Sequence, residues 1–280
     1  MIDVFIDTNI LHSRNEQLDK ALFVEKLKEI IGEIEINDIY TEIKILLPRM
    51  VLNELYQQQL EMFDDLNKRL ENVSMPNMQY DRAFNYGEYL ETTFKKAITE
   101  LKQGIVAVEV VDFPASDRLN SIISRAIKKE PPFEGKEKHS DKGFKDVLIW
   151  ESIKEYKEKH INDTIVFYCN DNLLASNALR KEFKEDFRDE IYIEQKNALM
   201  KRLTTLCNKN ETEKTFSSQL NERIENCLSH NNEILYDLLM EDPVWNDGDT
   251  ISDFEVKKVN ILNCNCLLYT SPSPRDRSLS

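Results

Sequence analysis

The stretch Asp3-Val-Phe-Ile-Asp-Thr-Asn9 decides the expected fold of this chain. Its first part, Asp3–Ile6, is short and largely apolar, with the β-branched and aromatic residues that favour strands. The residues that follow, Asp7, Thr8 and Asn9, are types that frequently cap the N-terminus of a helix. The stretch therefore predicts a buried strand that runs directly into a helix.

The same alternation continues over the next two hundred residues. Further strands are expected at Ile43–Leu47, Ile105–Val111, Thr164–Cys169 and Glu190–Ile193. Apolar residues at helical spacing predict the intervening helices near 18–31, after Pro48, and at 81–102, 116–129, 145–159 and 173–182. Strands that alternate with helices indicate an α/β fold with a doubly wound parallel sheet of about five strands.

Composition limits the classes of protein that fit. The chain has 280 residues, 41% of them hydrophobic, and a formal net charge of -14. That charge is unusual for a nucleic-acid-binding protein, which commonly carries a basic stripe. An enzyme that gathers carboxylates around divalent cations can nevertheless meet phosphate through the metal.

The lack of a recognisable targeting signal and the pattern of cysteines favour a cytoplasmic protein. The first residues enter a strand directly, so no secretory signal is expected, and no apolar run is long enough to predict a membrane span or a membrane partner. The five cysteines are scattered and include no Cys-x-x-Cys pair. A reducing compartment is therefore expected.

Three parts are predicted along the chain: a main domain at 1–207, a helical and acidic extension at 208–265 that is expected to be truncated, and a tail at 266–280. The tail contains Cys266-Leu-Leu-Tyr-Thr-Ser-Pro-Ser-Pro-Arg-Asp276, which resembles a one-frame translation of a transposase adapter used in sequencing libraries. An ordinary Ser/Pro-rich tail is the alternative. We expect an artefact and exclude these residues from the fold.

Four carboxylates are candidates for one site. Asp7 and Asp171 follow predicted strands, and ligands of open α/β sheets gather beyond the carboxyl ends of the strands. Each could instead be a simple helix N-cap. Glu54 and Asp146 lie on the predicted inward faces of helices, where a carboxylate is costly unless it is paired or binds a metal. A buried salt bridge is the alternative, but a shared cation accounts for all four acids together.

The chemistry of these ligands favours hard cations. Carboxylate oxygens suit Mg²⁺ or Mn²⁺, and one or two such ions can activate water for an in-line attack on a phosphodiester. None of the four histidines has a partner at i, i+4 spacing, so a zinc site is not expected.

Four blocks of the chain resemble, in order, the motifs of the PIN-domain nucleases over about residues 1–200. They are Val4-Phe-Ile-Asp-Thr-Asn9, Leu47-Pro-Arg-Met-Val-Leu-Asn-Glu-Leu55, Lys142-Gly-Phe-Lys-Asp-Val-Leu-Ile-Trp150 and Ile165-Val-Phe-Tyr-Cys-Asn-Asp171. The resemblance implies a PIN-like parallel sheet of order 3-2-1-4-5 and a phosphodiesterase, most often an endoribonuclease, that uses Mg²⁺ or Mn²⁺. It implies a catalytic and metal-binding set of Asp7, Glu54, Asp146 and Asp171, supported by Thr8, Asn9 and Asn170.

The predicted function is hydrolysis of RNA, single-stranded above all, by a metal-activated water held by the four-carboxylate cluster. DNA is the less favoured substrate. Lys142 and Lys145 flank Asp146 and could contact substrate phosphates, although solvated lysines would look the same. The alternative in another class is a catalytically silent PIN-like scaffold or protein-interaction domain. A dehalogenase-type phosphatase needs a second acid where Asn9 stands, so it is set aside. The sequence does not name any inhibitory protein partner.

Overall fold

The computed structural model describes residues 1–13, 17–71, 84–133 and 143–230. Lys142, the acidic stretch after residue 230 and the adapter-like tail at 266–280 lie outside the described residues. The chain divides into two compact units, Met1–Cys207 and Asn208–Ser280. The three-part division from the sequence stays a prediction. No helix in the described ranges has the length and apolar character required of a transmembrane span.

A five-stranded parallel sheet forms the centre of the first unit. Its strand order is β3-β2-β1-β4-β5, and every neighbouring pair is parallel, which confirms the predicted fold class and order. The strands are β1 (Ile2–Ile6), β2 (Ile43–Pro48), β3 (Ala107–Val111), β4 (Thr164–Tyr168) and β5 (Tyr192–Glu194). All five residues of β1 are buried, as expected for a central parallel strand covered on both faces.

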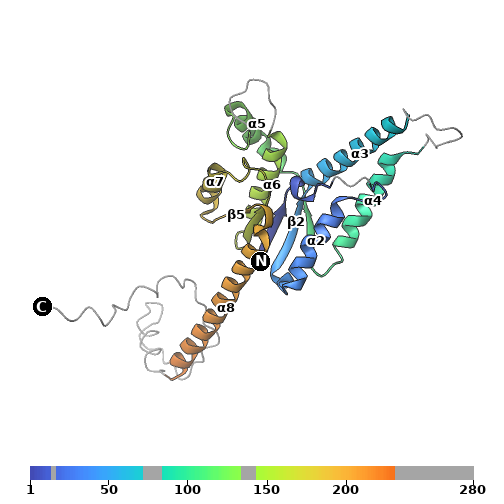
Figure 1. Cartoon of the computed structure of the whole chain (residues 1–280). Coiled ribbons are helices and arrows are strands. Elements are labelled where there is room, and N and C mark those ends of the chain that lie inside the picture. Colours follow the sequence, from blue (N-terminus) through green and yellow to red (C-terminus); the bar gives the residue numbers. More distant parts are fainter. Residues whose placement is uncertain (14–16, 72–83, 134–142, 231–280) are drawn as a thin grey trace, which may run out of the picture. The chain divides into compact units, whose positions relative to one another are not determined.

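Helices cover both faces of the sheet (Figure 1). The helices of the described residues are α1 (Thr8–Leu11), α2 (Phe23–Ile36), α3 (Arg49–Glu71), α4 (Tyr86–Leu101), α5 (Leu119–Lys128), α6 (Phe144–Lys159), α7 (Asn177–Phe187) and α8 (Leu199–His230), with short 3-10 turns η1 (Tyr40–Glu42), η2 (Ser116–Arg118) and η3 (Lys196–Ala198). Aromatic contacts join the helices on each side: Phe23 of α2 lies 5.0 Å from Phe94 of α4 between ring centroids. On the other face, Trp150 of α6 and Phe183 of α7 are 6.1 Å apart.

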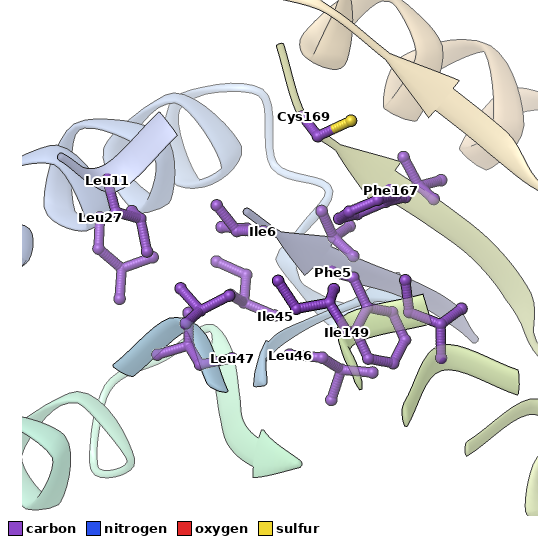
Figure 2. Packing of buried hydrophobic residues seen from close by; sticks show 14 of the residues in the cluster. Phe5, Ile6, Leu11, Leu27, Ile45, Leu46, Leu47, Ile149, Phe167 and Cys169 are labelled. Atoms are coloured by element: carbon purple, nitrogen blue, oxygen red, sulfur yellow. The ribbon is translucent and has the colours of Figure 1, made fainter. Parts of the chain in front are cut away.

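The hydrophobic core lies on both sides of β1, because successive side chains of a strand point to opposite faces. Phe5 is in register with Leu46 of β2, and its ring meets Tyr156 of α6 at 5.4 Å. Figure 2 shows this face with Ile149, and shows Leu11 and Leu27 packed on the opposite face. The sheet is therefore held between two apolar layers, which fixes the positions of its strand ends.

Two helix predictions were wrong. The helix expected at 173–182 begins only at Asn177, because the Asp171 side chain accepts the backbone N–H groups of Leu173 and Leu174 and holds a turn there. The spacing of apolar residues also predicts two separate C-terminal helices, one at 197–206 and one at 213–240. Instead α8 runs without a break from Leu199 to His230, since no Gly or Pro interrupts it.

Candidate active site

The fold brings all four predicted acids to the carboxyl edge of the sheet. Asp7 directly follows β1, and Asp171 lies in the turn after β4. Glu54 is in the second turn of α3, the helix that leaves β2, and Asp146 is in the first turn of α6. Four segments far apart in sequence thus converge around Asp7, whose carboxylate interacts electrostatically with the other three acids.

Asp7 is the most deeply placed acid of the set. Its side chain is 5% exposed, and its backbone N–H donates to the Tyr168 carbonyl, which continues the β1–β4 ladder. Burial raises the pKa of Asp7 to about 7, and the charges of Asp146, Glu54 and Asp171 add to the rise. The backbone N–H of Thr8 offsets part of it. A carboxylate in such surroundings favours a bound cation as its counter-charge.

Glu54 is held by two contacts on opposite oxygens. The Thr8 hydroxyl donates to Oε2 at 2.7 Å, and the Lys145 ammonium donates to Oε1 at 2.9 Å. The Glu54 side chain is 20% exposed and that of Lys145 is 55% exposed. Lys145 therefore neutralises Glu54 in this state, and its predicted contact with substrate phosphate stays a prediction.

Gly143 sets the start of α6 and with it the positions of Lys145 and Asp146. Its φ is +100°, a left-handed conformation that side chains rarely adopt, and a Cβ there would lie 2.7 Å from the Pro132 carbonyl oxygen. The Gly143 carbonyl accepts the N–H of Val147 and closes the first helical turn. Gly143 therefore allows the start of α6 to lie close to the backbone of Pro132 and Phe133.

Asp171 has a structural contact as well as a place in the site. Its Oδ1 accepts the N–H of Leu173 at 2.6 Å and of Leu174 at 3.1 Å. Gln195, which the sequence did not single out, donates from Nε2 to the Asp171 carbonyl at 3.5 Å. A glutamine between a strand and a short turn has no recognisable pattern, so only the fold reveals this support.

The predicted supporting residues lie beside the acids. Oδ1 of Asn9 accepts the backbone N–H of Asn170 at 3.1 Å and ties the segment after β1 to the segment after β4. Cys169, which directly follows β4, is buried with the hydrophobic core (Figure 2). Burial raises the pKa of Cys169 to about 12, and nearby Asp7 adds to the rise. Because only a thiolate is a good nucleophile, a protonated Cys169 does not serve as one.

The donor set suits a hard divalent cation in its chemistry. It consists of carboxylates, and the ammonium group of Lys145 contacts one of them, Glu54. In the described ranges, no group of three or more His, Cys, Asp or Glu side chains is arranged so that it could hold a metal ion. Two of the acids already have partners: Lys145 contacts Glu54, and two backbone N–H groups contact Asp171. A cation bound by all four acids would compete with these partners.

Comparison with known proteins identifies the class. A model of the PIN domain matches residues 4–174, which is more than half of the chain. The chain therefore belongs to the PIN-domain family. PIN domains are generally nucleases that bind divalent metals, so the fold is of the nuclease type. No curated protein and no solved structure matches the chain significantly.

Proposed function

We propose that this protein is an endoribonuclease that hydrolyses phosphodiester bonds of single-stranded RNA with Mg²⁺ or Mn²⁺. The single observation that carries the proposal is the convergence of Glu54, Asp146 and Asp171 on the buried Asp7, whose pKa burial and these three charges raise to about 7. The charges of the other three acids disfavour the ionised form of Asp7, and a bound cation would offset that repulsion.

Asp7, Glu54, Asp146 and Asp171 are the residues that would hold the cation. When bound, such an ion activates water and neutralises the charge that builds up on the phosphate. The chain's own residues prepare that arrangement. Thr8 orients Glu54 through its hydroxyl, and the turn after Asp171 fixes the backbone of the fourth acid.

Lys145 has two proposed tasks at different times. Before a cation binds, its ammonium group neutralises Glu54. Once a cation takes Glu54, the 55% exposed lysine side chain is released and lies near the place where substrate phosphates would arrive. The flexible four-carbon stem of lysine suits this change of partner.

A catalytically silent scaffold is the second candidate function. It is favoured by the fact that Glu54 and Asp171 already have partners within the chain. A scaffold, however, has no need to bury Asp7 among three other acids, because each unneutralised buried charge costs folding free energy. Binding of a divalent cation would separate the two candidates.

The test of the proposed function is cleavage of end-labelled single-stranded RNA and single-stranded DNA of one sequence, each with Mn²⁺ or with EDTA. We expect internal cleavage of the RNA with Mn²⁺ and none with EDTA. Preferential cleavage of the DNA would show that the substrate is DNA rather than RNA. Absence of cleavage of both, together with a melting temperature indifferent to Mn²⁺, would favour the scaffold.

A further inference from the structure

A cavity of about 660 Å³ is lined by residues that neighbour Asp7 and Asp171 in the chain. Its walls come from α1, α2, the segment after β4, η3 and the first residues of α8. This volume is within the range of about 300–1,000 Å³ that small-molecule pockets occupy. Two of its wall residues, Asn9 and Asn170, lie two positions after Asp7 and one position before Asp171. The cavity and the candidate active site therefore share a wall.

The polar groups in the wall are mainly amides. Asn9, Asn170 and Asn197 line the cavity from three different segments, together with the phenol of Tyr168. An amide side chain carries both donors and an acceptor and can match the edge of a nucleobase. Oδ1 of Asn9 already accepts the backbone N–H of Asn170, so Asn197 is the amide on which the test below is placed. Burial and the carboxylate of Glu33 raise the pKa of Tyr168, so the phenol stays protonated near neutral pH.

The apolar part of the wall completes a surface suited to a flat ring. Leu199 is buried and Met200 is half-buried, and both belong to the start of α8. The aromatic ring of Tyr168 lies in the same wall. Aromatic and apolar side chains stack against the faces of bases, whereas amides read their edges.

The charges of the wall argue against a phosphate in this cavity. Nζ of Lys26 lies 2.7 Å from Oε2 of Glu29, so this ammonium group is already neutralised. Glu33 adds a further exposed carboxylate to the lining. With two carboxylates to one ammonium group, the wall repels an anion but accepts an uncharged ring.

We propose that this cavity is a nucleobase subsite, which holds the base of a substrate nucleotide next to the bond that is cut. The proposal rests on the proposed nuclease function for its role, but the binding of a base can be measured without cleavage. Because Asn9 and Asn170 lie next to the segments that carry Asp7 and Asp171, the sugar and phosphate of a nucleotide whose base entered the cavity would lie toward these acids.

The test is an NMR titration of the full chain in EDTA with adenosine, guanosine, cytidine and uridine, and with ribose 5-phosphate as the probe that lacks a base. At least one nucleoside is expected to bind with a millimolar or lower dissociation constant, and more tightly than ribose 5-phosphate. Asn197→Ala should weaken that binding about fivefold or more, as expected for a lost hydrogen bond. Asn162→Ala, an exposed asparagine at the opposite edge of the sheet, is the matched control and should leave it unchanged.

The outcomes separate this proposal from the function proposed above. If no nucleoside binds, if ribose 5-phosphate binds equally well, or if Asn162→Ala weakens binding as much as Asn197→Ala, the base subsite is overturned, even when the protein cleaves RNA. If a nucleoside binds in the expected way but neither RNA nor DNA is cleaved with Mn²⁺, the subsite stands as a nucleobase site and the nuclease function fails. Melting curves of both variants establish that each is folded.

Discussion

The ammonium group of Lys145 lies 2.9 Å from Oε1 of Glu54 and joins the N-terminal turn of α6 to α3. Glu54 therefore carries an internal counter-charge, whereas burial and the charges of the other three acids raise the pKa of Asp7. The proposed cation and this lysine compete for the same oxygen. That competition makes the lysine a direct probe of the site.

Replacing Lys145 should strengthen cation binding. Lys145→Gln removes a competing positive charge, and a half-exposed ion pair is worth up to about 1 kcal/mol, or about fivefold in affinity. Isothermal titration of the metal-free variant with Mn²⁺ should therefore give a dissociation constant about two- to fivefold lower. Lys181→Gln, an exposed lysine paired with Glu185 on α7, is the control and should have no effect. A weaker affinity in Lys145→Gln would rule out the competition.

Thr8 should matter through its hydroxyl. Thr8→Val keeps the shape of the side chain but removes the donor to Oε2 of Glu54, a hydrogen bond to a charged group worth about 1.5–3 kcal/mol. We expect the melting temperature to fall by roughly 3–12 °C, at 2–4 °C per kcal/mol. Thr8→Ser retains the donor and should recover most of the loss. Equal melting temperatures for Thr8→Val and the wild type would mean that the contact between Thr8 and Glu54 contributes nothing to stability.

Asp171 allows its two roles to be separated. Asp171→Asn keeps the oxygen that accepts the N–H groups of Leu173 and Leu174, whereas Asp171→Ala removes it. The alanine variant should lose about 0.5–2 kcal/mol of stability, the usual value of a lost capping side chain, and the asparagine variant much less. Both should lose cleavage activity. Full activity in Asp171→Asn would make this residue a structural cap only.

The alternation of strands and helices and the edge of the sheet that holds the acids could be predicted from local patterns in the sequence, whereas the strand order came from the resemblance to PIN domains. The strands are short and mainly apolar, Asp7 directly follows β1, and Asp171 lies in the turn after β4. The start of α7 could not be predicted in this way. Helical spacing of apolar residues does not reveal that the Asp171 side chain takes the first N–H groups of the segment.

Contacts across the sheet edge were beyond prediction for a different reason. The pairing of Lys145 with Glu54 joins residues 91 positions apart and depends on how α6 packs beside α3. The cavity wall at Asn197 likewise needs the chain to return beside Asn9 after β5. Residue types and spacing identify a group's chemistry, but packing between distant elements decides its partners.

The stability of the metal-free protein should fall as pH rises from about 4 to 6. Asp3 on β1 is fully buried, and neither carboxylate oxygen has a hydrogen-bond partner among the described residues. Burial raises the pKa of Asp3 from 3.8 to about 6, with a further rise from Asp163 and an offset from Lys44. The folded state therefore binds the proton more tightly than the unfolded chain. The stabilisation that the proton on Asp3 gives to the folded state is complete below pH 4 and is lost as the pH rises past 6.

The two pKa values differ by about two units, which limits this effect to about 3 kcal/mol. Asp3→Asn should make that part of the profile less steep, since Asp7 also titrates there, and should stabilise the protein above pH 6. Urea unfolding of the wild type and of Asp3→Asn in EDTA at pH 4, 5, 6 and 7 measures the free energy of unfolding and its dependence on pH. An Asp3→Asn profile parallel to that of the wild type would show that the carboxyl group does not titrate in this range.

The most direct test of the central claim is the initial rate of RNA cleavage with Mn²⁺ by Asp7→Asn and by Asp146→Asn. Asp38→Asn is the matched control, because Asp38 is exposed and has a positive φ that asparagine tolerates. The account predicts a loss of at least about a hundredfold in both site variants, with intact folds and a wild-type rate in the control. Cleavage by purified Asp7→Asn or Asp146→Asn at close to the wild-type rate would contradict it.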